Sequence, residues 1–131
     1  EYNNIDLIKL KKEANSYKEA KTIIYSYLDS WSNSGKIKLI PVGQGIKGDV
    51  NIICEQIISK DSWNKFVSYG GIDTSDVAKF LQLKNKLPRD LNISLDDLYN
   101  YLCGDAEPIG STKDVIDAFK NLSVLKALRD L

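Results

Sequence analysis

Residues 36–48 decide the fold class, and they read Lys36-Ile37-Lys38-Leu39-Ile40-Pro41-Val42-Gly43-Gln44-Gly45-Ile46-Lys47-Gly48. The first part of this stretch, from Lys36 to Val42, alternates in side-chain type, with Ile37 and Leu39 on one side. Such alternation is typical of a β-strand. Pro41 lacks an N–H for the ladder, which places the end of the strand at a sheet edge. We therefore expect a strand over these residues.

The residues after this strand are expected to complete a β-hairpin. Gly43 to Gly48 form a turn-prone loop, and Asp49 to Ser59 are rich in β-branched side chains. A glycine-rich connection from a strand into such a segment favours a second strand. The alternative is a helix, because the apolar residues of this segment also fit one helical face; these are Val50, Ile53, Cys54, Ile57 and Ile58.

The sequence before the strand is expected to be helical from Ile5 to Trp31. Apolar residues recur there every three or four positions and form a stripe that is interrupted once. Ser-Asn-Ser-Gly at 32–35 ends the pattern, and Gly35 is suited to a left-handed helix cap. The alternative is two helices with a break near Asn15-Ser16.

Four shorter helices are expected after residue 60, each opened by a capping residue. The openings are Asp61, Asp73-Thr74-Ser75, Ser94-Leu95-Asp96-Asp97 and Ser111-Thr112-Lys113-Asp114. The first of these helices is expected to end at Gly70-Gly71, and the third at Gly104. We therefore expect an α+β fold: a mostly helical single domain over residues 1–131, with a small β-hairpin after a long N-terminal helix. We expect the chain to be a processed product or a domain cut from a longer protein, because it lacks an initiator Met.

Composition excludes several kinds of site. The chain has 131 residues, 18 Lys and Arg against 18 Asp and Glu, and no His. Without His there is no Ser-His-Asp or Cys-His nucleophile and no His-ligated metal. Cys54 and Cys103 form no Cys-x-x-Cys pair and are expected to be buried free thiols. We expect no metal and no cofactor.

The glycine loop is the sharpest motif, because residues 43–50 satisfy the pattern G-x-G-x-x-G-x-V. Its residue pattern resembles the Gly-rich loop of protein kinases or a dinucleotide-binding fingerprint, but the other kinase motifs and a repeating βαβ pattern are missing. The favoured interpretation is a tight hairpin loop. The functional alternative is an anion-binding loop, since glycines let backbone amides approach phosphates. Its candidate residues are Lys36, Lys38, Gly43, Gly45, Lys47 and Gly48.

An enzyme is the less favoured class. A His-free nuclease or toxin domain acting on a phosphate-containing substrate would have Lys47 and Glu55 as weak catalytic candidates. In a site of the Asp…Glu-x-Lys type, a Lys should stand two residues after Glu55, where this chain has Ile57. We therefore assign no catalytic residue.

The favoured function is a non-catalytic protein–protein interaction or accessory domain. Zero net charge removes a strong drive toward nucleic acid, which stays a weaker alternative partner. Trp31, Trp63 and Tyr99 are the candidate partner-binding residues, since aromatic side chains often anchor contacts. No apolar run approaches the ~20 residues of a membrane span. We expect no membrane association and a cytoplasmic protein, unless a targeting segment has been removed.

Overall fold

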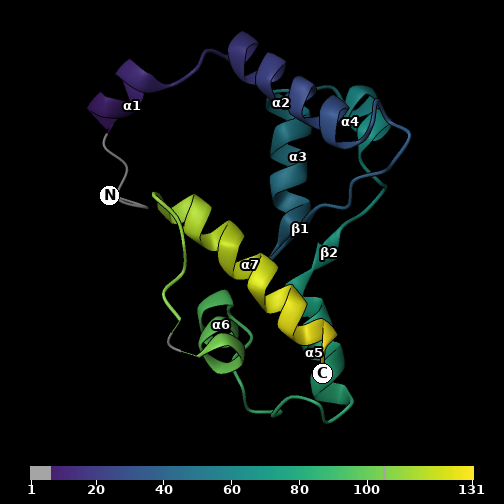
Figure 1. The fold of residues 1–131 in the computed structure, drawn as a ribbon, viewed down its shortest axis with the longest axis vertical. Coiled ribbons are helices and arrows are strands. Elements are labelled where there is room, and N and C mark those ends of the chain that lie inside the picture. The colour runs from purple at the N-terminus through teal and green to yellow at the C-terminus, as the bar shows by residue number, and fades with distance from the viewer. Residues whose placement is uncertain (1–6, 105) are drawn as a thin grey trace. The chain divides into compact units, whose positions relative to one another are not determined.

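The computed structural model describes residues 7–104 and 106–131 and has a mostly helical α+β fold (Figure 1), as predicted. In chain order the elements are α1 (Leu7–Glu13), α2 (Tyr17–Trp31), β1 (Val42–Gly43), α3 (Ile46–Gln56), α4 (Lys60–Phe66), β2 (Ile72–Asp73), α5 (Thr74–Leu83), α6 (Leu95–Cys103) and α7 (Lys113–Arg129). Of the four helices after residue 60, α7 is the longest at 17 residues, so the expectation that all four are shorter than the N-terminal helix is wrong for α7.

Contacts within the chain group it into two compact units. The N-terminal unit comprises Glu1–Leu39 and Val50–Tyr69, and the C-terminal unit comprises Ile40–Asp49 and Gly70–Leu131. Each unit is described by itself below. The expectation of one domain over residues 1–131 stays a prediction, because two compact units can be parts of one domain.

The N-terminal helical segment is two helices, which confirms the alternative with a break near Asn15-Ser16. The predicted start at Ile5 lies outside the described residues. Ser16 caps α2: its Oγ accepts a hydrogen bond from Glu19 N at 3.3 Å, and Glu19 Oε2 accepts one from Ser16 N at 2.7 Å. This reciprocal pair satisfies two amides that a helix start leaves unpaired. It therefore begins a new helix where a single one could have continued.

The predicted hairpin is wrong. β1 pairs in parallel with β2, with Val42 opposite Ile72 and Gly43 opposite Asp73. The predicted strand over 36–42 is reduced to an isolated parallel bridge between Leu39 and Val67 and the first residue of β1. Parallel strands need a long crossover connection, and here it contains α3 and α4.

Residues 49–59, favoured as the second strand, are mostly helical instead. α3 runs to Gln56, and the side chains of Val50, Ile53 and Cys54 are partly buried against the N-terminal core. Ile53 and Cys54 follow Val50 by three and four residues, which places all three side chains on one face of a helix. This burial outweighs the weak β-propensity of isoleucine and valine.

The N-terminal unit has an apolar core around α4. Its buried members are Leu28, Ile58, Trp63, Phe66 and Val67. The Tyr25 ring meets the Phe66 ring edge to face, with 5.0 Å between centroids. The capping residue of α4 is Ser59 and not the predicted Asp61, since Ser59 Oγ accepts from Ser62 N. α4 ends at Phe66 rather than at Gly70-Gly71, because Val67 turns into the bridge with Leu39.

The C-terminal unit packs α5, α6 and α7 around a second core. Its buried members are Ala78, Leu87, Leu98, Tyr99, Val124 and Leu128. The predicted caps Asp73 and Ser94 are confirmed, and α6 runs to Cys103 with Gly104, the predicted end, as its C-terminal cap. α7 is capped by Thr112, one residue after the predicted start of the capping pattern.

Both cysteines are free, and both are partly rather than fully buried. Burial raises the pKa of the Cys54 thiol, which nearby Lys60 opposes, and burial alone raises the pKa of Cys103. Thiols in such surroundings are less reactive, because the thiolate is the nucleophile. Across the described residues, none of the helices combines the length and apolar character that a membrane crossing requires.

Candidate functional site

The glycine loop, residues 43–48, is bonded to other segments of the C-terminal unit. Gly43 lies in β1, Gly45 adopts a left-handed φ of +70°, and Gly48 lies in the first turn of α3. Gly45 N donates a hydrogen bond to Asp73 Oδ2 at 2.9 Å. The Gly45 amide, which the anion-binding alternative directs at an external anion, is therefore paired with a carboxylate of the chain itself.

Asp73 gathers several donors at this point. Ser75 N and Ser75 Oγ donate to its Oδ1 at 2.9 and 2.7 Å, and Gly45 N binds its other oxygen. Partial burial works to raise the pKa of Asp73, but these hydrogen bonds to the ionised form together lower it below its ordinary value. The carboxyl group is thus held as a carboxylate that both caps α5 and holds the loop. An incoming phosphate would meet this negative charge.

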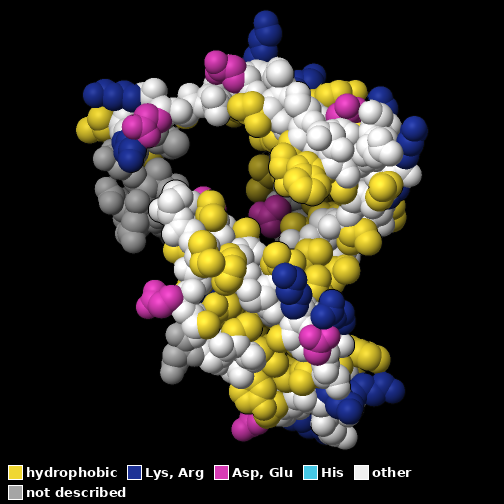
Figure 2. All heavy atoms as spheres, viewed as in Figure 1, with side chains coloured by type: hydrophobic (Ala, Val, Ile, Leu, Met, Phe, Trp, Pro, Cys, Tyr) yellow, Lys and Arg dark blue, Asp and Glu magenta, His cyan; other side chains and the backbone are white. Residues whose placement is uncertain are grey.

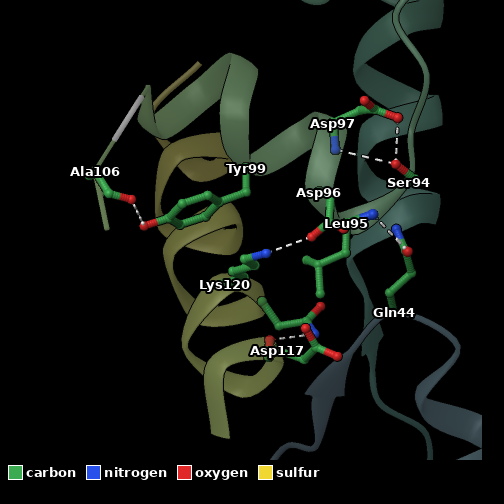
Figure 3. A network of polar contacts seen from close by, with 10 residues as sticks. Gln44, Ser94, Leu95, Asp96, Asp97, Tyr99, Ala106, Asp117 and Lys120 are labelled. Atoms are coloured by element: carbon green, nitrogen blue, oxygen red, sulfur yellow. Dashed lines mark hydrogen bonds and ion pairs between the residues drawn. The ribbon is translucent and has the colours of Figure 1, made fainter. Parts of the chain in front are cut away.

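Gln44, between the two glycines, joins the loop to the start of α6. Its Nε2 donates to Ile93 O at 2.7 Å, and its Oε1 accepts from Leu95 N at 3.0 Å. Figure 3 shows the Gln44 side chain directed at Leu95. One side-chain amide therefore satisfies two backbone groups that lie 49 and 51 residues away in sequence.

The six predicted anion-binding residues are divided between the units. Lys36 and Lys38 belong to the N-terminal unit, and Gly43, Gly45, Lys47 and Gly48 to the C-terminal unit. Lys38 Nζ donates to Asn64 O at 2.7 Å and Lys65 O at 2.6 Å, at the carbonyl end of α4. A cation there is matched to the negative end of the helix dipole. The charge of Lys38 thus has a structural use, while Lys36 and Lys47 are exposed.

The weak catalytic candidates Lys47 and Glu55 are both exposed on α3. They lie eight residues apart, which along a helix is a rise of about 12 Å. In the described part of the chain, His, Cys, Asp and Glu form no group of three or more that could hold a metal ion. Two surface depressions of about 390 and 400 Å³ are lined by neither Lys47 nor Glu55.

Those two depressions lie in the C-terminal unit and are open to solvent. One is lined by Pro88, Asp90, Leu91, Asn92, Asp97 and Tyr101. The other is lined by Gly71, Ile72, Asp73, Asp76, Val77 and Phe80. Asn92 and Asp97 already accept hydrogen bonds around Ser94, and Asp73 is occupied as described above. Polar groups at both depressions therefore already have hydrogen-bond partners within the chain.

Two of the three predicted partner-binding residues are buried. Trp63 is 8% exposed and belongs to the N-terminal core. Tyr99 belongs to the C-terminal core, and its hydroxyl donates to Ala106 O at 3.0 Å (Figure 3). Lys120 Nζ lies 5.8 Å from the centre of the Tyr99 ring and 2.6 Å from Asp96 Oδ1. Tyr99 therefore organises the contact between α6 and α7.

Trp31, the third candidate, is 66% exposed at the end of α2. It belongs to a row that we call the α2 stripe: Ile23, Tyr27 and Trp31, all exposed and spaced four residues apart. The rings of Tyr27 and Trp31 lie 5.9 Å apart at 39°. Figure 2 shows hydrophobic side chains over α2 and α4 in the N-terminal unit, with most lysines there at the margin.

Ile23 and Tyr27 were not among the predicted partner-binding residues. On the neighbouring face of α2, Ile24, Tyr25 and Leu28 face or border the core. The sequence does contain a signal for the α2 stripe: it is a second apolar row on α2, beside the core-facing row. A helix needs only one apolar row to pack against a core. The α2 stripe is thus surplus to the packing of the unit.

Comparisons with protein-family models, with curated proteins and with solved structures gave no match for this chain.

Proposed function

We propose that this chain is a non-catalytic protein–protein interaction or accessory domain and that the α2 stripe is its contact surface. The observation that carries the proposal is the exposed Trp31 ring, packed beside the exposed Tyr27 ring on one face of a regular helix. Trp and Tyr are enriched among the residues that dominate binding energy at protein interfaces. Large exposed apolar side chains in one row are a common mark of such interfaces.

The energetics support a protein partner. Covering a large apolar side chain contributes about 1.5–3 kcal/mol, so three neighbours offer a useful gain. The Tyr27–Trp31 contact and the helical backbone restrict these side chains before binding, which reduces the ordering cost. The stripe itself carries no charge, and the two lysines of α2 are balanced by two carboxylates. An apolar protein surface matches this stripe better than a polyanion does.

Site-specific photo-cross-linking in cells that express the protein tests the proposal. We expect a cross-linking residue at position 27 to give a discrete protein adduct. The same residue at Thr22, an exposed position on α2 outside the stripe, should not. Trp31→Ala should reduce the adduct formed from position 27 without altering the circular dichroism spectrum, because Trp31 is exposed. Equal adducts from positions 22 and 27, or an adduct indifferent to Trp31→Ala, would contradict the proposal.

The hydrolytic alternative is tested by an RNA-degradation assay. Wild-type protein is compared with Lys47→Ala and Glu55→Ala, which are both exposed positions. We expect no cleavage by any of the three. Cleavage by wild type that both substitutions abolish would replace the interaction proposal with the enzyme.

A further inference from the structure

The end of α5 and the loop after it carry a dense run of positive charge. Between Asp76 and Asp90 the sequence contains Lys79, Lys84, Lys86 and Arg89 and no carboxylate. Lys79 pairs with Asp76 at 3.3 Å, and Arg89 Nε donates to the neutral Asn85 Oδ1 at 3.2 Å. Lys79 is therefore the cation of this segment for which the structure shows an ion pair, and its partner Asp76 lies just before the segment.

Two large apolar side chains stand among these cations. Phe80 is 57% exposed and Leu83 is 75% exposed. The opposite face of α5 is anchored, because Ala78 and Thr74 are fully buried and Thr74 Oγ1 donates to Asn121 Oδ1 at 3.0 Å. The rotation of α5 about its axis is fixed by these contacts. Phe80 and Leu83 must consequently face outward.

The loop after α5 is held in place from inside. Gln82 Nε2 donates to Pro88 O at 2.8 Å and to Leu91 O at 2.9 Å, and the Leu87 side chain is buried in the core. Lys86 and Arg89 therefore project from a braced backbone. Lys84 Nζ lies 5.7 Å from the centre of the Phe80 ring. Basic and apolar side chains thus alternate on one surface whose backbone is fixed by these contacts.

Figure 2 shows this mixture, with dark blue and yellow side chains side by side at the end of the C-terminal unit where α5 ends in Figure 1. We call the surface the α5 ridge, and it comprises Lys79, Phe80, Leu83, Lys84, Lys86 and Arg89. We propose that the α5 ridge binds an acidic amphipathic segment of a partner protein. Apolar side chains of the segment cover Phe80 and Leu83, and its carboxylates pair with Lys84, Lys86 and Arg89.

Charge complementarity selects this occupant. The ridge is positive, but the C-terminal unit as a whole carries nine Lys and Arg against eleven Asp and Glu. A long polyanion would extend beyond the ridge and meet the excess carboxylates, whereas a short acidic segment matches the ridge alone. Asp76 and Asp90 border this run of cations and repel carboxylates at its two ends. The carboxylates of the bound segment therefore lie between them, over Lys84, Lys86 and Arg89.

A fluorescence-polarisation titration tests the proposal. The probe is a labelled synthetic peptide with Leu and Glu arranged on one helical face, compared with the same peptide carrying Gln for Glu. We expect saturable binding of the Leu/Glu peptide that weakens at higher salt, and binding of the Leu/Gln peptide that is about tenfold weaker. Equal binding of the two peptides would overturn the proposal.

Matched variants locate the site. The triple substitution Lys84→Gln, Lys86→Gln, Arg89→Gln should weaken binding about tenfold, and so should Phe80→Ala with Leu83→Ala. The control is Lys18→Gln, Lys21→Gln, Lys36→Gln, which removes three exposed charges from the N-terminal unit and should leave binding unchanged. An equal loss in the control triple, or no loss in either ridge variant, would refute the assignment. So would tighter binding of a single-stranded RNA or of anionic phospholipid vesicles than of the Leu/Glu peptide.

Discussion

The N-terminal unit relies on aromatic packing, whereas the C-terminal unit adds polar side-chain clamps to its apolar core. Phe66 and Trp63 form the centre of the first unit, and Lys38 ties its strand-like segment to α4. In the second unit Gln44, Asp73 and Lys120 join segments that are 24 to 51 residues apart. Apolar packing tolerates a mixed exposed surface, while side-chain clamps specify one register between distant elements.

The two units also differ in the surfaces that they leave exposed. The α2 stripe is uncharged and aromatic, and the α5 ridge is positive and only partly apolar. Both tryptophans lie in the N-terminal unit, so tryptophan fluorescence follows that unit, whereas circular dichroism follows both. The difference can therefore be measured unit by unit.

Removing the central aromatic ring should have the largest effect. Phe66→Ala leaves a cavity at a fully buried site and removes the Tyr25 contact, for an expected loss of about 3–5 kcal/mol in the free energy of unfolding. Urea unfolding followed by tryptophan fluorescence measures it. The counterpart Leu98→Ala, at a fully buried site of the C-terminal core, should lower the circular dichroism transition by about 2–5 kcal/mol. An unchanged fluorescence midpoint in Phe66→Ala would contradict the role given to that ring.

A methyl group at Gly71 should displace the backbone just before β2 and lower stability. A Cβ there would lie 2.7 Å from Pro41 O, a backbone atom that also accepts from Ile72 N. We expect Gly71→Ala to cost about 1–3 kcal/mol. The matched control is Gly48→Ala in α3, where a Cβ meets nothing within 4 Å and should stabilise by about 0.5–1 kcal/mol. Thermal unfolding by circular dichroism compares them, and a tolerated Gly71→Ala would rule out this close approach.

Cutting the Gln44 clamp should separate the loop from α6. Gln44→Ala removes one donor and one acceptor, for an expected loss of about 1–3 kcal/mol. Gln44→Glu keeps the acceptor for Leu95 N but places an oxygen against Ile93 O, so it should also destabilise. Urea unfolding by circular dichroism reports both variants. Wild-type stability in Gln44→Ala would show that the clamp adds nothing to the apolar core.

Asp73 should make the C-terminal unit sensitive to acid. Its pKa is lower in the folded protein than in the unfolded chain, so its stabilisation is complete above the unfolded value of about 4. It is lost as the pH falls through the folded pKa. Asp73→Asn keeps a capping side chain and should lower stability at neutral pH by about 1 kcal/mol. Unfolding measured between pH 2 and pH 7 should show a smaller pH dependence in the variant, and an identical slope would contradict the assignment.

Lys38 should have the smallest effect. Lys38→Gln weakens the contacts with the carbonyl end of α4 and should cost about 0.3–1 kcal/mol, measured by tryptophan fluorescence. Lys36→Gln removes the same charge from an exposed neighbour and serves as the control, with no expected change. Equal losses of stability in the two variants would mean that Lys38 stabilises the unit through its charge alone and not through its contact with the end of α4.

Helix starts were the most predictable part of the fold. Asp73 and Ser94 cap α5 and α6 as expected, since a cap binds an amide two or three residues away. The break at Ser16 was visible for the same reason. Residues 49–59 were misassigned because a run of isoleucines fits either a strand or a helix until its burial is known. The parallel pairing of β1 with β2 depends on residues about 30 positions apart, which no local pattern connects.

The candidate site divides in the same way. The sequence by itself determined the absence of histidine chemistry, the balanced charge, the helices other than α3, and the caps at Asp73 and Ser94, because composition and short-range hydrogen bonding are local properties. Tertiary structure alone decided that Trp63 and Tyr99 are buried while Trp31 is exposed, and that Asp73 occupies the loop amide of Gly45. Burial and long-range pairing depend on which faces of distant segments meet, and one helix can carry more apolar residues than its core can cover.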